Sequence, residues 1–265
     1  MEMKYLMIGG LFVLIIVGIL FIMRNSNKGG NSFKKSESKE INTQRDGKFT
    51  KNDISLYIFN WKKTNENTLK LYNKAIKIID DVTIVNSDEN YKFNENIKTI
   101  QLDDSYYYGG QYDSAIKDVK NNKIFGVIVG DTINVDFNKL ISKLLNTYNN
   151  YNVGIYSPHD LRSWWQNNVL YDITNELKVV DNTDVGIWFL NPKIVKQLKN
   201  LDYNISYFGW GIDVITIKQC KKENLLVIRD YSIKTDQIDK STGYDSSKAK
   251  HYEKKLIEHY EKYIN

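Results

Sequence analysis

The sequence contains little cysteine and no repeated unit. A single cysteine, Cys220, occurs among the 265 residues, which excludes a disulfide within the chain and gives no sign of an oxidising compartment. No segment of the sequence recurs at a fixed spacing. An array of repeated units is therefore not expected.

The larger part of the chain also lacks net charge. Residues 1–51 contain nine Lys or Arg residues and four acidic residues, which accounts for the formal net charge of +5 of the chain. Residues 52–265 therefore balance to zero. Because nucleic-acid binding needs positive charge gathered on a folded surface, the basic isoelectric point does not indicate a nucleic-acid partner, and none is predicted.

Charged residues are absent from the nineteen positions between Tyr5 and Met23. A helix of this length spans roughly 28 Å, which is enough to cross a bilayer. The apolar run ends in Phe21-Ile22-Met23-Arg24, without the small residues of a signal-peptide cleavage site. We predict an uncleaved membrane anchor over residues 1–23; a buried core helix and a cleaved leader are the alternatives.

Residues 24–51 are polar and basic, and they contain too little apolar surface to pack, so they are predicted to form a tether. The basic residues after the anchor favour a cytoplasmic position for the domain over 52–265. The sequon Asn204-Ile205-Ser206 is usable only in a secretory lumen. We predict a single-pass membrane protein whose orientation is open. A host or virion membrane is one of the options.

Strand and helix patterns alternate in the first half of the predicted domain. Strands are expected over residues 54–59, 82–85, 97–102, 124–129 and 153–156, and helices over 65–79, 111–120 and 137–148. This alternation predicts βαβ units and an α/β fold: a Rossmann-like, mostly parallel sheet with helices on both faces. In the second half we expect strands over 172–180, 185–190 and 225–228, and helices over 193–199, 214–222 and 246–264.

Polar residues follow the strands of the first half. Asn60, Asp88, Asp103 and Asp131 each come just after an expected strand. Because ligands of such sheets bind beyond the carboxyl ends of the strands, these residues predict a binding edge. The alternative is that Asp and Asn are common turn and N-cap residues.

The stretch from Tyr207 to Asp213 places a carboxylate just after two glycines and an indole. Glycine allows positive φ and close approach of the backbone to a ligand. The Trp210 ring offers a flat apolar face, and Asp213 at a helix start can remove a proton. This pattern is typical of an active-site floor; the alternative is a glycine-rich turn with a buried Trp and an N-capping Asp.

Together these residues resemble the inverting, nucleotide-sugar-dependent glycosyltransferases of the GT-A fold, close to family 2. The resemblance covers roughly residues 53–255. Its most specific segments are Asn182-Thr183-Asp184 with Ile187-Trp188-Phe189, Gly209-Trp210-Gly211-Ile212-Asp213, Val227-Ile228-Arg229-Asp230, and Thr242-Gly243-Tyr244. The first half fits more loosely, because a nucleotide-binding α/β half is common to many proteins.

The resemblance implies a role for each matching residue. It implies nucleotide-sugar contacts at Asn60, Asp88, Tyr112 and Asp131, with Asp88 accepting from an N–H of uracil or guanine. It places the general base at Asp213. The acceptor side would be lined by Asp184, Trp188, Trp210 and Gly211.

The sequence departs from the family pattern at the expected metal site. Val129 stands where a carboxylate should precede Asp131 by two residues, and the family histidine after the last strand is replaced by a segment containing Asp236. None of the three histidines falls at that position. The resemblance therefore implies a divalent cation, Mn²⁺ or Mg²⁺, on Asp131 and Asp236 only weakly, since diphosphate-bound cations need few protein ligands.

The activity implied is transfer of a hexose from a nucleotide-sugar to a hydroxyl of a glycan or protein acceptor, with inversion. Two other interpretations remain open at this point. A catalytically inactive binding or structural protein on the same scaffold is suggested by Val129. A nucleotidyltransferase would need several basic residues over a triphosphate, and none lies beside Gly109-Gly110.

Overall fold

A computed structural model describes residues 48–161, 168–238 and 246–264. The expected anchor over 1–23, most of the tether and the Thr242-Gly243-Tyr244 segment lie outside these ranges. Within them, no helix combines the length and the apolar character that a membrane span requires.

The first half of the domain forms the parallel part of the central sheet. Strand β1 (Ile54–Asn60) pairs in parallel with β2 (Val82–Asn86) and β4 (Ile124–Val129), and β2 pairs with β3 (Thr99–Gln101). Every residue of β1 is buried, as a strand covered on both faces requires. The predicted βαβ half is confirmed.

The second half is not mostly parallel, which corrects the sequence prediction. Strand β9 (Ile187–Leu190) runs antiparallel between β4 and β6 (Val153–Asp160). Strand β8 (Leu177–Val180) pairs antiparallel with β7 (Val169–Asp172) and with β10 (Leu226–Gln237). Only β7 and β8 are joined by a short connection, as antiparallel neighbours can be; the other antiparallel pairs join strands that are far apart in the sequence.

The complete strand order is β3-β2-β1-β4-β9-β6-β10-β8-β7, and the short strand β5 (Thr132–Ile133) pairs with the far end of β10. Strand β10 continues well past the expected end at residue 228 and pairs in parallel with β6. Its register shifts between Asp230 and Lys234, where the pairing is irregular. Such an irregularity bends a strand and redirects its side chains.

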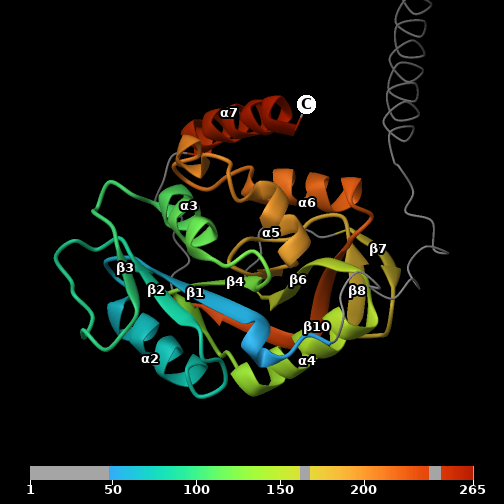
Figure 1. Ribbon diagram of the computed structural model, residues 1–265, viewed down its shortest axis with the longest axis horizontal. Coiled ribbons are helices and arrows are strands. Elements are labelled where there is room, and N and C mark those ends of the chain that lie inside the picture. The colour runs from blue at the N-terminus through green and yellow to red at the C-terminus, as the bar shows by residue number, and fades with distance from the viewer. Residues whose placement is uncertain (1–47, 162–167, 239–245, 265) are drawn as a thin grey trace, which may run out of the picture. The chain divides into compact units, whose positions relative to one another are not determined.

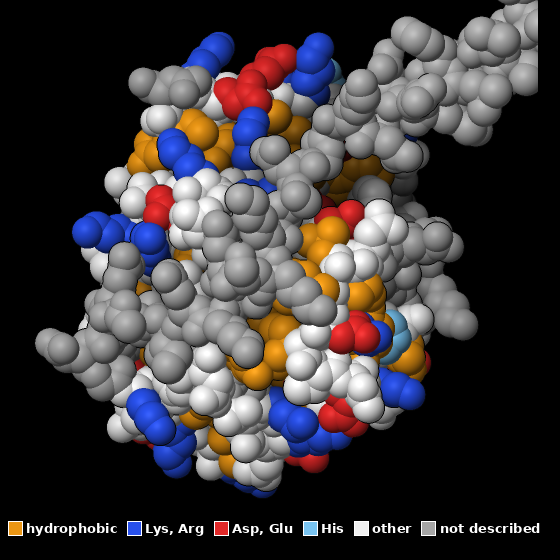
Figure 2. Space-filling view, turned by 90° about the vertical axis from the view of Figure 1, so that its right-hand side faces the viewer, with side chains coloured by type: hydrophobic (Ala, Val, Ile, Leu, Met, Phe, Trp, Pro, Cys, Tyr) orange, Lys and Arg blue, Asp and Glu red, His pale blue; other side chains and the backbone are white. Residues whose placement is uncertain are grey.

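Helices cover both faces of this sheet (Figure 1). On one face lie α2 (Asn65–Ala75) and α4 (Phe137–Asn150); on the other lie α3 (Tyr108–Asp118), α5 (Pro192–Leu198), α6 (Ile212–Lys222) and α7 (Ser246–Ile264). On the face shown in Figure 2, the Lys and Arg side chains of the described residues are interspersed with Asp and Glu.

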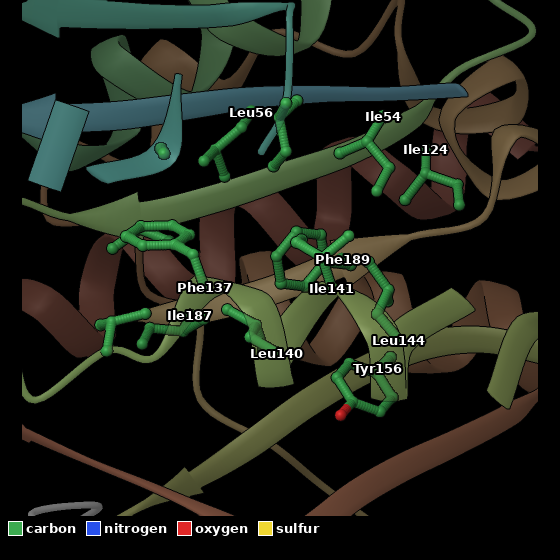
Figure 3. Packing of buried hydrophobic residues seen from close by; sticks show 14 of the residues in the cluster. Ile54, Leu56, Ile124, Phe137, Leu140, Ile141, Leu144, Tyr156, Ile187 and Phe189 are labelled. Carbon is green, nitrogen blue, oxygen red and sulfur yellow. The ribbon is translucent and has the colours of Figure 1, made fainter. Parts of the chain in front are cut away.

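The core beneath α4 fixes the middle of the sheet. Figure 3 shows Leu140, Ile141 and Leu144 of the helix packed toward Phe189 and Ile187 of β9. A Cβ on Gly126 of β4 would lie 2.6 Å from the Phe189 ring, so glycine is needed there for the ring to fit.

Truncation of Leu144 tests this packing. Leu144→Ala is expected to lower the free energy of unfolding by about 2 to 5 kcal/mol, because it removes a buried side chain and leaves a cavity. The control Ser142→Ala, at an exposed position of the same helix, should change it by less than about 0.5 kcal/mol. Urea unfolding measures both, and an equal loss in the two variants would contradict the assigned helix face.

Candidate active site

Amide side chains join the carboxyl ends of β1 and β2. The Nδ2 group of Asn60 donates to Oδ1 of Asn86 at 2.7 Å and to Oδ1 of Asn65 at 2.6 Å. The Nδ2 group of Asn65 then donates to Oδ2 of Asp88 at 3.0 Å. The structure thus brings Asn60 and Asp88 into one hydrogen-bonded network with Asn86, which also follows an expected strand, and Asn65 is the member that the sequence reasoning missed.

Gln111 closes this network from helix α3. Its Nε2 group donates to the backbone oxygens of Asn60 at 2.6 Å and Val85 at 3.3 Å, which bridges β1 and β2 at their ends. Gln111 is buried. The signal that could have found it is the Gly109-Gly110 pair, which marks a closely packed helix start, although Gly109 lies against the backbone of Ser206 rather than against the strands.

Tyr112 and Trp188 do not line a site, which corrects their assignment. Both side chains are fully buried, and their rings lie 6.0 Å apart in the core between the sheet and the helices. Tyr112 also contacts Phe125 and Tyr203. Since α3 begins at Tyr108, three residues before the expected start, the helix turns Tyr112 toward the sheet while Gln111 faces its edge.

The first turn of α3 lies against the glycine-tryptophan loop. The backbone N–H of Gly109 donates to the oxygen of Tyr207 at 3.1 Å, and a Cβ on Gly109 would lie 1.8 Å from the Ser206 oxygen. Gly209 has a φ of 82°, and a Cβ there would lie 2.3 Å from the Tyr108 ring. Glycine is required at both positions, so the nucleotide half and the loop are held together.

Asp213 occupies the first turn of α6, two residues after Gly211, whose φ is 90°. Its side chain is only partly exposed. Burial, together with the negative charges of Glu253 on α7 and of Asp184, raises the pKa of Asp213 to about 6. The carboxylate thus combines a helix-start position with an environment that favours holding a proton near neutral pH.

Trp210 and Glu253 lie next to Gly211 on the loop side and the α7 side respectively. The oxygen of Trp210 accepts a hydrogen bond from Oγ of Ser206 at 2.7 Å, and the Trp210 side chain is partly exposed. A Cβ on Gly211 would lie 3.3 Å from Cγ of Glu253. The terminal helix therefore contributes to this site, which the sequence reasoning did not foresee.

Asp184 and Arg229 lie together beside this loop. Nη2 of Arg229 donates to Oγ1 of Thr183 at 3.0 Å and lies 3.6 Å from Oδ2 of Asp184. The Arg229 side chain is 1% exposed and that of Asp184 is 20% exposed. Burial lowers the pKa of the Arg229 guanidinium, and the Asp184 carboxylate acts in the opposite direction.

Asp131 directly precedes β5, and Asp236 lies on β10, the strand that pairs with β5. Ile133 is opposite Asp236, and the N–H of Ile238 donates to the oxygen of Asp131 at 2.8 Å. In an antiparallel pair this register places both Asp residues on one face. Asn67 fixes the turn before β5, donating to the oxygens of Gly130 at 2.8 Å and Thr132 at 2.7 Å.

The donor chemistry of this pair fits a hard cation. Two carboxylates on one face suit Mg²⁺ or Mn²⁺ when phosphate oxygens and water complete the coordination. In the described ranges, no three His, Cys, Asp or Glu side chains form a group that could hold a metal ion by themselves. Any cation here would therefore depend on a bound phosphate for most of its ligands.

Comparisons with known proteins support the fold assignment. No protein-family model and no curated protein matches the sequence. GalNAc-T7, solved with UDP, GalNAc and Mn²⁺, is 10% identical with a TM-score of 0.54 over 79% of this chain and 48% of its own, so the chain spans about half the length of that protein.

A second similar structure is matched over most of its length. Glucosyl-3-phosphoglycerate synthase from Mycobacterium tuberculosis, solved with Mn²⁺, UDP and glucosyl-3-phosphoglycerate, is 8% identical with a TM-score of 0.51 over 81% of this chain and 84% of its own. At these identities the likeness shows the fold alone. The fold of this chain is that of GT-A glycosyltransferases, as the sequence resemblance predicted.

The environment of Asp213 predicts a stabilising substitution. A carboxyl whose pKa is raised by folding destabilises the folded state when it ionises, so this penalty appears as pH rises from about 4 to about 6. Asp213→Asn should therefore raise the free energy of unfolding at pH 7 by roughly 1 to 3 kcal/mol. The gain should shrink toward pH 4.

Chemical unfolding of both proteins at the two pH values checks this. The difference between variant and wild type removes the contribution of the other carboxylates. A variant less stable than wild type at pH 7 would show that Asp213 is ionised at no cost.

Proposed function

We propose that the protein is a glycosyltransferase that moves a sugar from a nucleotide-sugar to an acceptor hydroxyl with inversion, using Asp213 as the general base. The observation that carries this proposal is Asp213 itself: a partly buried carboxylate with a pKa raised to about 6, held after a positive-φ glycine in a GT-A fold. A general base works best when its pKa lies near the working pH.

The nucleoside is assigned to the amide network at the ends of β1 and β2. Asp88 would accept a hydrogen bond from an N–H of uracil or guanine, and the buried Asn60 would support it from behind through Asn65. The links through Asn65 already fix these side chains, and Gln111 holds the backbone oxygen of Asn60, so binding costs little reorganisation. GalNAc-T7 and glucosyl-3-phosphoglycerate synthase were both solved with UDP, which favours a uridine nucleotide for this chain.

In the reaction, Asp213 takes the proton of the acceptor hydroxyl while that oxygen attacks the anomeric carbon on the face opposite the leaving diphosphate. A single displacement inverts the configuration. Asp184, Trp210 and Gly211 would line the acceptor side, where the Trp210 ring can stack on a sugar. Asp131 and Asp236 would hold a divalent cation, which supplies positive charge to the departing diphosphate.

Arg229 does not take part in neutralising the diphosphate in this proposal. Its side chain is buried behind Thr183 and Asp184 and is paired with them. The N-terminal apolar segment is proposed to anchor the enzyme in a membrane, with a glycan or a protein as acceptor.

Replacement of the base tests the mechanism. Asp213→Asn should lower kcat for transfer by about 10² to 10⁴, while the affinity for nucleoside diphosphate stays close to that of wild type. In the wild type, kcat/KM should fall about tenfold per pH unit below about pH 6, because Asp213 becomes protonated.

A panel of nucleotide-sugars, followed by nucleoside diphosphate release and by NMR of the product anomer, provides the measurement. Activity of Asp213→Asn within a few-fold of wild type would remove the base assignment. A product with retained configuration would exclude the single displacement.

Cation dependence is a separate prediction. Asp131→Asn and Asp236→Asn should each raise the Mn²⁺ concentration needed for half-maximal activity by about tenfold or more, because each removes a ligand. Asp172→Asn, on the exposed strand β7, is the matched control and should change nothing. Full activity in EDTA would contradict the cation site.

A further inference from the structure

The guanidinium of Arg229 is buried, yet it makes few hydrogen bonds for a charged group in the interior. Only its Nη2 group contacts a partner, donating to Thr183 and facing Asp184. Among the residues that the structure describes, its Nε and Nη1 groups have no hydrogen-bond acceptor. A buried charge with unused donors is costly, so its retention calls for an explanation other than stability.

Among the described residues, the carboxylate of Asp184 also has a buried oxygen without a hydrogen-bond donor. Its Oδ2 atom is buried and accepts no hydrogen bond from the described part of the chain, although Arg229 lies 3.6 Å away. That separation is an ion pair rather than a hydrogen bond. Arg229 therefore balances the charge of the carboxylate at Oδ2, and the exposed remainder of the side chain is the part that can reach a ligand.

The neighbours of Asp184 show where its side chain lies. The side chain is 20% exposed, whereas Arg229 is enclosed. The Asp184 charge acts on Asp213, and the Tyr108 hydroxyl donates to the backbone oxygen of Val185, the residue after Asp184. The partly exposed Asp184 therefore lies near the proposed base, and the residue after it is held by Tyr108 of α3.

Other polar groups around Arg229 do not replace Asp184 as its partner. Asp160 accepts from Nε2 of Gln237 at 3.1 Å, and Asp230 accepts from the Tyr156 hydroxyl at 2.7 Å. His159 stacks on Tyr231. Burial lowers the pKa of His159, and the positive charge of Arg229 is the second cause that lowers it. The Arg229 charge is therefore directed mainly to Thr183 and Asp184.

We propose that Arg229 is a positioning residue that acts through Asp184: it holds this carboxylate in place toward the acceptor, so that Asp184 binds one acceptor hydroxyl while Asp213 deprotonates another. Arg229 touches neither substrate. The inference rests on the proposed function, because it assigns a role within the acceptor side of that site.

The experiment is a double-mutant cycle on acceptor KM. Arg229→Gln and Asp184→Asn should each raise the acceptor KM about tenfold or more, as expected for losing a hydrogen bond to a charged group. The double variant should be no worse than Asp184→Asn alone, because Arg229 has nothing left to position. The affinity for nucleoside diphosphate should stay within about twofold of wild type in all three variants.

Two further variants provide the matched controls. Arg229→Lys keeps the charge and should recover part of the acceptor KM. Lys178→Gln removes a cation on the neighbouring strand that pairs with Asp172 at 3.2 Å, and it should leave the acceptor KM unchanged. If Arg229→Gln does not fold, Thr183→Val replaces it, since this change removes the acceptor of the Nη2 hydrogen bond and preserves volume.

The possible results separate the two hypotheses. Fully additive effects of Arg229→Gln and Asp184→Asn, or a loss of nucleoside diphosphate affinity in Arg229→Gln, would overturn the positioning role. An unchanged acceptor KM in Thr183→Val would do the same where Arg229→Gln is unfolded. If the wild type binds no nucleotide and transfers no sugar, the proposed function itself fails, and this inference fails with it.

Discussion

The contact between the first turn of α3 and the loop from Ser206 to Gly211 holds the candidate site together. Gly109 and Gly209 are needed because a Cβ at either would collide with the opposing segment. The same helix turn carries Gln111, which bridges the ends of β1 and β2. The same loop leads directly into Asp213. One packing contact therefore sets the ends of β1 and β2 and Asp213 relative to each other.

Two carboxylates near this contact are kept in different environments. Asp213 lies where burial and neighbouring acidic residues raise its pKa to about 6, which suits proton transfer. Asp184 lies against a buried guanidinium, which suits a fixed negative charge. The arrangement costs stability at Asp213 and leaves donors of Arg229 unused. Such costs are expected where a site is organised for binding and catalysis rather than for stability.

The sequence predicts local features of this protein better than long-range ones. The apolar runs of β1 and β4 and the helical spacing of α4 identify those elements, and the polar residues after the strands locate Asn60 and Asp88. The antiparallel position of β9 depends on a partner strand about sixty residues away. The extension of β10 through charged residues depends on its pairing with β6.

The same limit applies to the site. The glycine pattern before Asp213 is local and points to the base directly. Whether an aromatic residue such as Tyr112 or Trp188 faces a ligand or the core depends on helix phase and on packing across the sheet, which one sequence does not contain. The Arg229 pairing with Thr183 joins segments forty-six residues apart for the same reason.

The most direct test of the account is calorimetric titration of the full chain with UDP and GDP, each with and without Mn²⁺. The account predicts that one of the two nucleotides binds preferentially, that Mn²⁺ strengthens binding, and that Asp88→Asn weakens it. Absence of binding by either nucleotide under both conditions would contradict a nucleotide-sugar site and favour a binding or structural protein built on the same fold.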